Sequence, residues 1–474
     1  MHKPMYAQER PLAFSCRRLQ WLLPAILLSA ITVTVWRHEF TYPVLSATPK
    51  VQQTGKGGTQ VKEAGEHHAP ASAPHTKPAE PWNFDLQRDE LNFGLSDEQC
   101  QIAFPDLYYE LDRARDHLLK QNRKLTEEDV QVDKEGPTNS WRHGEFHCMI
   151  YDGELYVINE VKGDPDRSRG LAALANIYRA LTAIPNPRSI PNIEFVFDIE
   201  DKADLGETQP DRIRWAWARP KDNPWLWVMP DFDGWAYPDD VVGGYVNFRD
   251  DVRDVEAEFK EGWHDKEAKL SWRGSLAVNT SLRQGLVAAA ENKSWSDVEA
   301  IDWHNRSNIM AMTDFCRYQY VAHTEGNSWS GRLRYLQNCD NVPVIHKLEY
   351  VAHYYPLLKD SGPHQNYVKV ERDWSDLDET MEALLKDPQK SHRIAAESTR
   401  VFRDRYLTPA AEACYWRKMF RNWRQVMAFE PRKYDTFENG TKVRRGVSWE
   451  RFAFRQKHSF EHGFLEPDLQ EENE

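Results

Sequence analysis

The chain is short of positive charge. Of its 474 residues, 61 are Lys or Arg and 74 are Asp or Glu, which gives a formal net charge of −13. Proteins that bind nucleic acid usually carry an excess of basic residues, because they contact the phosphate backbone. The charge balance therefore argues against a nucleic-acid partner.

Charged residues are missing altogether from positions 19–36, which read LQWLLPAILLSAITVTVW. About 18 apolar residues are just enough to cross a bilayer. Arg10, Arg17 and Arg18 precede this segment, and positive charge on that side keeps an N-terminus cytosolic. Because no convincing small-residue cleavage site follows, we predict an uncleaved signal anchor at 19–36 after a cytosolic tail at 1–18. A signal peptide cleaved near residues 46–47 is the alternative.

Aromatic residues are missing from positions 43–80, which are rich in Gly, Pro, Ala, Thr and Lys. Such a composition cannot bury an apolar core, so we predict a disordered stem at 37–83. A short span, a stem and a globular body describe a single-pass type II protein of the Golgi or ER–Golgi membrane, with its body in the lumen. Four Asn-x-Ser/Thr sequons agree with this compartment: Asn279, Asn292, Asn305 and Asn439.

Cysteine is also scarce, with six in the whole chain. Cys16 belongs to the predicted cytosolic tail, and the five others face an oxidising lumen, where an odd number leaves one unpaired. Cys316 and Cys339 bracket a strand, a loop and a helix, so a bridge between them would clamp the loop. The sequence alone does not choose the connectivity.

Aromatic residues, by contrast, are abundant in the body. They make up 12% of the chain and include 18 Trp. Trp and Tyr suit carbohydrate surfaces, which their faces can cover while their polar edges form hydrogen bonds. For most of these residues, packing in the core is the better interpretation.

The most informative stretch is RYQYVAHTEGNSWSGRLRYLQNCDNVPVIH at 317–346, which reads as strand, loop, helix and strand. In a parallel βαβ unit this loop lies at the C-terminal end of the first strand, where open α/β sheets bind ligands. The loop offers backbone N–H groups, the hydroxyls of Ser328 and Ser330, and the cations Arg332 and Arg334. These groups favour a diphosphate. The alternative is an ordinary βα turn with surface arginines.

A second loop of the same kind occurs at 269–283, KLSWRGSLAVNTSLR. Two such loops suit a nucleotide-sugar, which carries two phosphates. Strands alternate with helices from residue 269 to residue 370, which predicts a parallel α/β sheet. Earlier in the chain we predict a helix with a capping box at 96–99, a hairpin around Asp152-Gly153 and a helix at 169–184.

The motifs WRGS, EGNSWSGRLRYL and VPVIH, in this order, resemble the glycosyltransferase 90 family, which includes fungal capsule-associated proteins and animal protein O-glucosyltransferases. The resemblance covers roughly residues 193–427. It implies an α/β fold of the B-type glycosyltransferase architecture, with two Rossmann-like domains facing a cleft. We place the acceptor-side domain at 84–255 and the UDP-sugar domain at 256–428, with its last helix crossing back, and a polar tail at 429–474.

A predicted buried strand at 193–197 ends in the acidic sequence Asp198-Ile199-Glu200-Asp201. Carboxylates at the end of such a strand lie where the cleft is expected, whereas a solvated acidic turn is the alternative. The resemblance implies that Asp201 is the general base, which takes the proton from an acceptor hydroxyl as the C–O bond forms. Asp198 is the second choice for this role.

The resemblance also implies a set of donor contacts: Ser275, Arg283, Gly326, Ser330 and Arg332. The interval from Ser275 to Arg283 is longer than in the animal members. Arg332 is expected to neutralise the leaving diphosphate, so that no metal or other cofactor is needed. Glu349 opens a helix predicted after the strand at 342–345. It either binds the ribose hydroxyls or provides a favourable charge at a helix N-terminus.

Asp231-Phe232-Asp233 matches the Asp-x-Asp signature with which another class of glycosyltransferases holds a metal on the diphosphate. Such short matches are frequent by chance, and the resemblance implies a cleft loop here. A metal-dependent A-type enzyme that uses Asp231 and Asp233 is therefore an alternative. Trp235 and Tyr237 either line an acceptor site or pack internally. For the cysteines, the resemblance implies bridges Cys316–Cys339 and Cys100–Cys414, with Cys148 free.

We therefore expect an inverting glycosyltransferase of the secretory pathway, held in the membrane by residues 19–36. It would move xylose or glucose from UDP-xylose or UDP-glucose to a hydroxyl of a glycan, glycolipid or glycoprotein. The fungal-like wording of DIEDK and EGNSWSGRLRYL favours xylosyl transfer to glycans or glycolipids. A non-catalytic Golgi carbohydrate-binding protein with the same fold is the second alternative.

Overall fold

The structure is a computed structural model, and its described residues belong to one compact unit, Pro78–Glu474. They are residues 82–132, 144–161, 167–203, 211–237, 242–302, 304–305 and 307–454. The predicted tail at 1–18, the predicted anchor at 19–36 and nearly all of the predicted stem lie outside them. Among the described residues, no helix combines the length and the apolar character needed to cross a membrane.

The first sheet has six strands in the order β17-β2-β1-β3-β4-β6. They are β1 (Glu145–Tyr151), β2 (Glu154–Val161), β3 (Ile193–Asp198), β4 (Trp215–Ala216), β6 (Trp227–Val228) and β17 (Val447–Ser448). β1 runs antiparallel to β2 and β3, whereas β3, β4 and β6 run parallel. The predicted hairpin is confirmed, because Asp152 and Gly153 take the positive φ angles of 56° and 83° that its tight turn requires.

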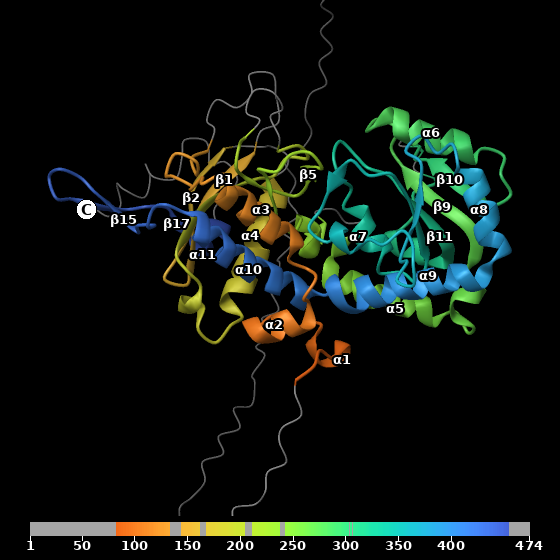
Figure 1. Cartoon of the computed structure of the whole chain (residues 1–474), viewed down its shortest axis with the longest axis horizontal. Helices are drawn as coiled ribbons and strands as arrows, with labels where there is room; N and C mark the ends of the chain where they lie inside the picture. Colours follow the sequence, from red (N-terminus) through yellow and green to blue (C-terminus); the bar gives the residue numbers. More distant parts are fainter. Residues whose placement is uncertain are drawn as a thin grey trace, which may run out of the picture. The chain divides into compact units, whose positions relative to one another are not determined.

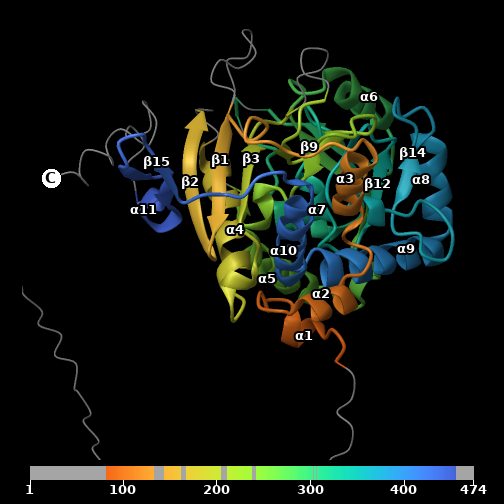
Figure 2. The same cartoon turned by 60° about the vertical axis from the view of Figure 1, so that its left-hand side comes forward.

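Most helices near this sheet come from the N-terminal part of the chain, and one long helix comes from the C-terminal part. They are α1 (Leu86–Asp89), α2 (Asp97–Ala103), α3 (Tyr109–Lys120), α4 (Arg167–Thr182), α10 (Pro409–Val426) and α11 (Trp449–Ala453). The capping box is confirmed at α2, where the side chains and backbone N–H groups of Ser96 and Gln99 are reciprocally hydrogen-bonded. α10 packs between α3 and α4 against the sheet (Figure 2).

Aromatic rings join α10 to the first sheet. The ring of Trp215 in β4 stacks on that of Phe195 in β3, with the centroids 3.9 Å apart. The rings of Trp416, Phe420 and Trp423 in α10 approach Trp215 at 6.2, 6.2 and 5.4 Å. All five residues are buried, so this part of the chain's tryptophan content forms core rather than a carbohydrate surface.

The second sheet has five strands in the order β10-β9-β11-β12-β14, and all of its pairs are parallel. They are β9 (Glu267–Gly274), β10 (Ser296–Ala300), β11 (Tyr318–His323), β12 (Val342–His346) and β14 (Val368–Val370). Its associated helices are α5 (Tyr245–Ala257), α6 (Thr280–Ala290), α7 (Arg332–Leu336), α8 (Leu377–Lys386) and α9 (Pro388–Val401). The predicted α/β class and the parallel sheet are confirmed. The arrangement as two domains facing a cleft stays a prediction.

Short pairings and helices connect the segments that build the two sheets. β5 (Arg219–Pro220) pairs with β13 (Tyr350–Val351). A π-helical turn, Phe402–Tyr406, connects α9 to the segment that leads into α10, which returns to the first sheet (Figure 1). The prediction of a helix starting at Glu349 is wrong, because this segment continues into strand β13. The Glu325 carboxylate accepts the N–H groups of Glu349 and Tyr350 there, both at 2.9 Å.

The C-terminal segment contributes to the first sheet. β15 (Tyr434–Thr436) and β16 (Lys442–Arg444) form a hairpin, and β17 then pairs with β2. Phe452 in α11 is buried, with its ring 6.3 Å from that of Phe146 in β1. Part of the predicted polar tail at 429–474 is therefore built into the body. The remaining short strands, β7 (Ala236–Tyr237) and β8 (Gly243–Gly244), pair with each other.

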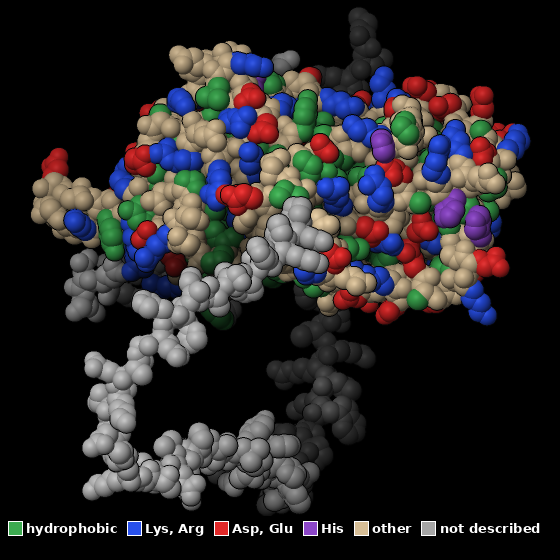
Figure 3. Space-filling model, turned by 60° about the horizontal axis from the view of Figure 1, so that its bottom comes forward, with side chains coloured by type: hydrophobic (Ala, Val, Ile, Leu, Met, Phe, Trp, Pro, Cys, Tyr) green, Lys and Arg blue, Asp and Glu red, His purple; other side chains and the backbone are tan. Residues whose placement is uncertain are grey.

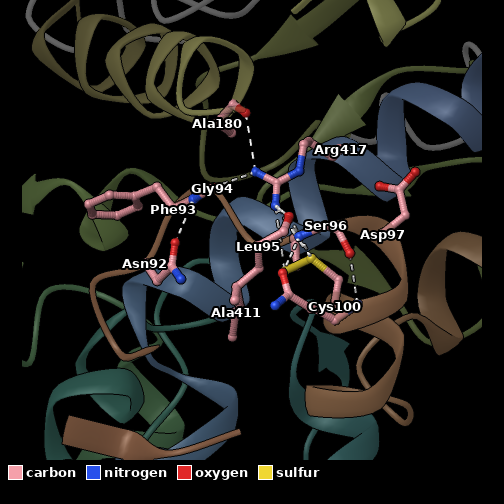
Figure 4. Close-up of a disulfide and its surroundings, with 12 residues drawn as sticks. Asn92, Phe93, Gly94, Leu95, Ser96, Asp97, Cys100, Ala180, Ala411 and Arg417 are labelled. Carbon is pink, nitrogen blue, oxygen red and sulfur yellow. Dashed lines mark hydrogen bonds between the residues drawn. A yellow bond between two sulfur atoms is a disulfide. The ribbon is translucent and has the colours of Figure 1, made fainter. Parts of the chain in front are cut away.

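Both predicted disulfides are present, and Cys148 is free and buried. Cys100–Cys414 joins α2 to α10 across a sequence separation of 314 residues. Arg417 lies beside this bridge (Figure 4), where it donates to the carbonyls of Phe93 at 2.7 Å and Ala180 at 3.2 Å. The bridge and the buried arginine thus fasten the N-terminal segment to a helix near the other end of the chain.

The face shown in Figure 3 carries acidic and basic side chains next to one another, with hydrophobic side chains scattered between them. Neither sign of charge forms a continuous patch on this face. The acidic excess of the chain is therefore spread out here rather than gathered in one place.

Candidate active site

The loop between β11 and α7 is fixed near its start, at Glu325, by the contacts of a buried carboxylate. Glu325 is fully buried, and besides its two bonds to the backbone before β13 it pairs with Arg372 at 2.7 Å. The Gly326 N–H donates to the Trp329 carbonyl at 3.3 Å, and a Cβ atom at Gly326 would lie 3.1 Å from that oxygen. Gly326 therefore lets the loop turn tightly upon itself. We call residues 325–331 the donor loop.

Two arginines from different helices approach the donor loop without an acid partner. Arg283 in α6 donates to the carbonyls of Ser275 at 2.8 Å and Glu325 at 3.3 Å. Arg332 at the start of α7 donates to the carbonyl of Arg273. Within the described part of the chain, neither guanidinium has a carboxylate in ion-pair range, whereas most buried arginines here do. Two such cations together form a site that an anion would stabilise.

The pKa shifts agree with this electrostatic picture. Burial, followed by the nearby charge of Arg283, lowers the pKa of Arg332 to about 10. Burial also lowers the pKa of Arg283. Both shifts have the direction expected for cations that lack a counter-ion, and a bound diphosphate would supply one.

The other predicted donor residues lie around these arginines. Ser275 follows β9, and its hydroxyl accepts the Ala277 N–H at 3.2 Å. Ser330 lies near the end of the donor loop, and its carbonyl accepts the Leu333 N–H at 3.3 Å. Because Arg283 contacts both Ser275 and Glu325, the structure brings the two predicted phosphate loops together. The loops lie close together because β9 and β11, which they follow, pair in parallel.

Glu349 lies near the donor loop, but its carboxylate already has a partner. Its side chain is 60% exposed and pairs with Arg372 at 2.8 Å. Arg372 also holds Glu325, so one arginine links the two acids. A pocket of about 340 Å³ lies beside Glu349 and Arg372, next to the segments that follow β12 and β14. The ribose role predicted for Glu349 stays a prediction.

Asp201 reaches the donor loop from the first sheet. Its carboxylate Oδ2 accepts the side-chain amide of Asn327 at 3.0 Å, and its backbone carbonyl accepts the Ser328 hydroxyl. On its other side, Oδ1 pairs with Arg169 of α4 at 3.0 Å. The Asp201 side chain is 36% exposed, so a substrate hydroxyl can still reach it. The acid predicted as the base and the loop predicted to bind the donor are therefore neighbours.

Asp198, the second choice, is placed quite differently. It ends β3, is only 1% exposed, and pairs with the buried Arg212 at 3.3 Å. One of its oxygens also accepts the Glu200 N–H at 2.8 Å, which shapes the turn toward Asp201. Asp198 thus stabilises the end of the strand, while Asp201 is the more accessible carboxylate.

Asp231 and Asp233 are each only 1% exposed, although Asp-x-Asp motifs that hold a metal face a cleft. Asp231 pairs with the buried Arg334 at 3.2 Å, and Asp233 accepts the Tyr335 hydroxyl at 3.4 Å. Burial, followed by the charge of Asp231, raises the pKa of Asp233 well above its ordinary value. Among the described residues there is no group of three His, Cys, Asp or Glu side chains that could hold a metal ion.

The remaining aromatic candidates flank this buried pair. Trp235 is 39% exposed, and the Arg179 guanidinium lies 4.7 Å from its ring centroid. Tyr237 is half-buried, with its ring 5.8 Å from that of Phe232. Trp235 therefore keeps more than a third of its surface exposed, whereas Tyr237 lies against Phe232.

A pocket of about 1000 Å³ opens away from these residues, between α3, β13 and the segment at 355–367. Its lining includes Tyr109, Lys221 and Tyr367, and none of the predicted donor residues or Asp201. Pocket size therefore does not point to the candidate site, which is recognised by its charges and contacts instead.

Sequence reasoning missed three residues that hold the site together: Arg169, Glu325 and Arg372. Glu325 stands directly before the glycine of the donor loop, which was the one available signal. Arg169 and Arg372 lie far from their partners in the sequence, at separations of 32 and 47 residues. Only the tertiary structure brings them into contact.

Comparison with known proteins identifies relatives over the part of the chain that contains the candidate site. A family model described as "Glycosyl transferase family 90" matches residues 121–446. Protein O-glucosyltransferase 3 of Mus musculus is 22% identical over 323 residues, which cover 65% of this chain and 61% of the relative. Protein O-glucosyltransferase 2 of Danio rerio is 23% identical over 309 residues, which cover 62% and 58%.

Protein O-glucosyltransferase 1 of Homo sapiens is 22% identical over 224 residues, which cover 45% of this chain and 54% of the relative. The matches to these three relatives thus span between 54% and 61% of their lengths. At this identity the side-chain chemistry has to be judged from the residues of this chain.

Proposed function

Because the chain belongs to glycosyl transferase family 90, we propose that it transfers a sugar from a UDP-sugar to a hydroxyl group of a glycan, glycolipid or glycoprotein. One observation carries this proposal above all others. Arg283 and Arg332, which have no acid partner in the described part of the chain, lie by a donor loop that also contacts the partly exposed carboxylate of Asp201. An anion site and a base in one place are what transfer from a sugar diphosphate requires.

The proposed reaction is a single displacement. Asp201 takes the proton from the acceptor hydroxyl, the acceptor oxygen forms a bond to the anomeric carbon, and the bond from that carbon to the diphosphate oxygen breaks. UDP leaves with the bonding electrons, and Arg283 and Arg332 stabilise its growing negative charge. Attack from the face opposite the leaving group inverts the anomeric configuration.

We propose that this chemistry needs no metal ion. The arginine pair would neutralise the diphosphate, a role for which A-type enzymes use a cation held by Asp-x-Asp. The burial of Asp231 and its pairing with Arg334 support this view over the A-type alternative. Activity that disappears with a chelator and returns with Mn²⁺ would favour that alternative.

The donor sugar is either glucose or xylose in this proposal. The relatives are named protein O-glucosyltransferases, which favours glucose and a protein acceptor. The fungal-like motif wording favours xylose and a glycan or glycolipid acceptor. We therefore keep both donors, UDP-glucose and UDP-xylose.

The test is a donor assay on a secreted form that contains residues 84–474. UDP release from a panel of UDP-sugars is measured with and without EDTA. Slow release from one donor, unchanged by EDTA, is the expected result. Binding of UDP in calorimetry without any turnover would indicate a missing acceptor. No UDP binding at all would favour the alternative of a non-catalytic Golgi carbohydrate-binding protein.

The base is tested by Asp201→Asn, which keeps the shape but cannot accept the proton. We expect a loss of transfer of about 10²–10⁴-fold, the usual contribution of a positioned general base. UDP binding should be unchanged, because the diphosphate contacts lie elsewhere. Transfer that continues at the wild-type rate would contradict the role of Asp201.

We further propose that residues 19–36 anchor the enzyme as a single-pass type II protein of the Golgi or ER–Golgi membrane, with its catalytic body in the lumen. The two disulfides support an oxidising compartment. Protease protection of the body in sealed vesicles, lost when detergent is added, is the expected result. Digestion without detergent would place the body on the cytosolic side.

A further inference from the structure

Asp201 is held by side chains from two other segments. Arg169 Nη1 lies 3.0 Å from carboxylate Oδ1, and Asn327 Nδ2 lies 3.0 Å from Oδ2. The Ser328 hydroxyl donates to the Asp201 backbone carbonyl. Both carboxylate oxygens are therefore oriented, one from helix α4 and one from the donor loop.

Arg169 has a fixed place of its own. It lies in the first turn of α4, and its guanidinium carbon is 5.1 Å from the ring centroid of Phe232. Phe232 is buried at 4% exposure, so the ring gives the guanidinium a rigid support. The direction from which Arg169 approaches Asp201 is thus set by packing.

Asn327 belongs to the donor loop, between Gly326 and Ser330. The base of this loop is fixed by Glu325, which is fully buried. The side-chain amide of Asn327 is uncharged, so it can orient a carboxylate without neutralising it. Part of the support of the base is therefore supplied by the loop that is proposed to bind the donor.

We propose that Arg169 and Asn327 are positioning residues that aim the Asp201 carboxylate at the acceptor hydroxyl. This inference rests on the proposed function, in which Asp201 is the base. Each carboxylate oxygen has two acceptor sites, and with one contact to each from the described residues a site remains for the substrate hydroxyl. Through the contact with Asn327, the orientation of the Asp201 carboxylate depends on the position of the donor loop.

If Arg169 and Asn327 had only a structural role, their substitution would have a different effect on kcat and on stability. Ion pairs and hydrogen bonds between partly exposed side chains contribute little to stability. Misplacing a reacting group by about 1 Å, by contrast, can reduce the rate about 100-fold. A positioning role therefore predicts a loss in kcat that is far larger than any change in thermal stability.

The experiment compares Asn327→Ala with Asn308→Ala in the full-length protein. Asn308 is the matched control, because its side-chain amide also donates to a carboxylate at 3.0 Å, that of Glu299. We expect Asn327→Ala to lower kcat about 10–100-fold. Its KM for the UDP-sugar and its melting temperature should stay within the range of the Asn308→Ala control.

Arg169 is tested by two substitutions. Arg169→Ala should lower kcat by a similar factor, and Arg169→Lys should restore part of it, because the cation remains. Arg317→Ala is the control. Arg317 forms a comparable ion pair with Glu258, with a length of 2.6 Å, and this pair lies away from the site. Equal activity of the Ala and Lys variants of Arg169 would overturn its part of the proposal.

The decisive measurement is a double-mutant cycle with Asp201→Asn. If Asn327 acts through Asp201, Asn327→Ala should cause no further loss of kcat in the Asp201→Asn background. An equal further loss there, or a change in donor KM alone, would overturn the proposal and make Asn327 a donor contact. Wild-type protein that neither turns over a UDP-sugar nor binds UDP would instead overturn the proposed function, and this inference with it.

Discussion

Arg332 is a partly buried arginine that has no acid partner among the described residues. Among the described residues its guanidinium donates to the backbone carbonyl of Arg273, and its pKa is lowered to about 10 by burial and by the charge of Arg283. A neighbouring arginine, Arg334, is fully buried and pairs with Asp231 and Glu412. The first cation is available to a ligand, while the second belongs to the core.

Arg332→Ala should therefore weaken UDP binding at least 10-fold, because a charge-assisted hydrogen bond contributes about 1.5–3 kcal/mol. Arg317→Ala, which removes an exposed and paired arginine, should leave binding unchanged. Isothermal titration calorimetry with UDP measures both. Equal affinity of the two variants would show that Arg332 does not contact the diphosphate.

Asp233 illustrates the opposite case, an acid whose surroundings favour the neutral form. Burial and the charge of Asp231 raise its pKa in the folded state. The folded protein then keeps a proton that the unfolded chain releases above its ordinary pKa of about 4. Stability supplied by this group is therefore present at low pH and is lost as pH rises through the raised pKa.

Asp233→Asn should remove this pH dependence, because the amide does not ionise. We expect its melting temperature to exceed that of the wild type at pH 8, with a smaller difference at pH 5. Differential scanning fluorimetry between these pH values is the measurement. Parallel curves for the two proteins would mean that Asp233 stays ionised in the fold.

At the scale of single elements, α7 meets the loop after β6 at a glycine. A Cβ atom on Gly331 would lie 1.6 Å from Oδ2 of Asp233, so any side chain there collides with the acid. Gly331→Ala should destabilise the protein, and the loss should be much smaller when Asp233→Ala has first made room. Urea unfolding of the four proteins in this cycle gives the coupling. Additive losses would mean that the contact does not limit packing.

The Cys316–Cys339 bridge encloses β11, the donor loop and α7 within 23 residues of sequence. In the chain-entropy account, a loop of this size contributes about 3 kcal/mol to stability. The Cys316→Ser, Cys339→Ser double variant should lose about that amount in urea unfolding, and it should bind UDP more weakly because the donor loop is less fixed. Unchanged UDP affinity would show that Glu325 and Arg372 alone fix the loop.

Elements with a strong local signal were predictable. The capping box at Ser96, the Asp152-Gly153 turn and the strand β11 each depend on residues close in sequence, and all three are confirmed. The helix expected at Glu349 failed because a distant carboxylate, Glu325, fixes that backbone in an extended form. β10 was not predicted either, because an edge strand with the sequence SDVEA has little apolar pattern.

The candidate site was predictable only in part for the same reason. The motifs located the donor loop and Asp201, because these are read along the chain. Their mutual contact through Asn327, and the support from Arg169, depend on segments 126 and 32 residues away from Asp201. No local pattern contains such information.

At the scale of the whole molecule, the C-terminal segment completes the first sheet. β17 covers the edge of β2, and the buried Arg445 pairs with Glu194 of β3 at 2.9 Å. A chain ending at residue 427 would leave that edge open and remove a partner from a buried acid, whereas a chain ending at residue 454 keeps these contacts. We expect the shorter chain to aggregate, as measured by its monomer yield in size-exclusion chromatography. Equal monomer yields would show that the segment is dispensable.

The path of α10 has a consequence for biosynthesis. This helix fills the core of the first sheet and carries Cys414, the partner of Cys100. Every strand of that sheet except β17 leaves the ribosome before the helix that buries it. The part of the first sheet that is made first therefore keeps apolar surface uncovered until α10 has been synthesised. The dependence of this protein on chaperones and on disulfide isomerases should thus be greatest for the half that is made first.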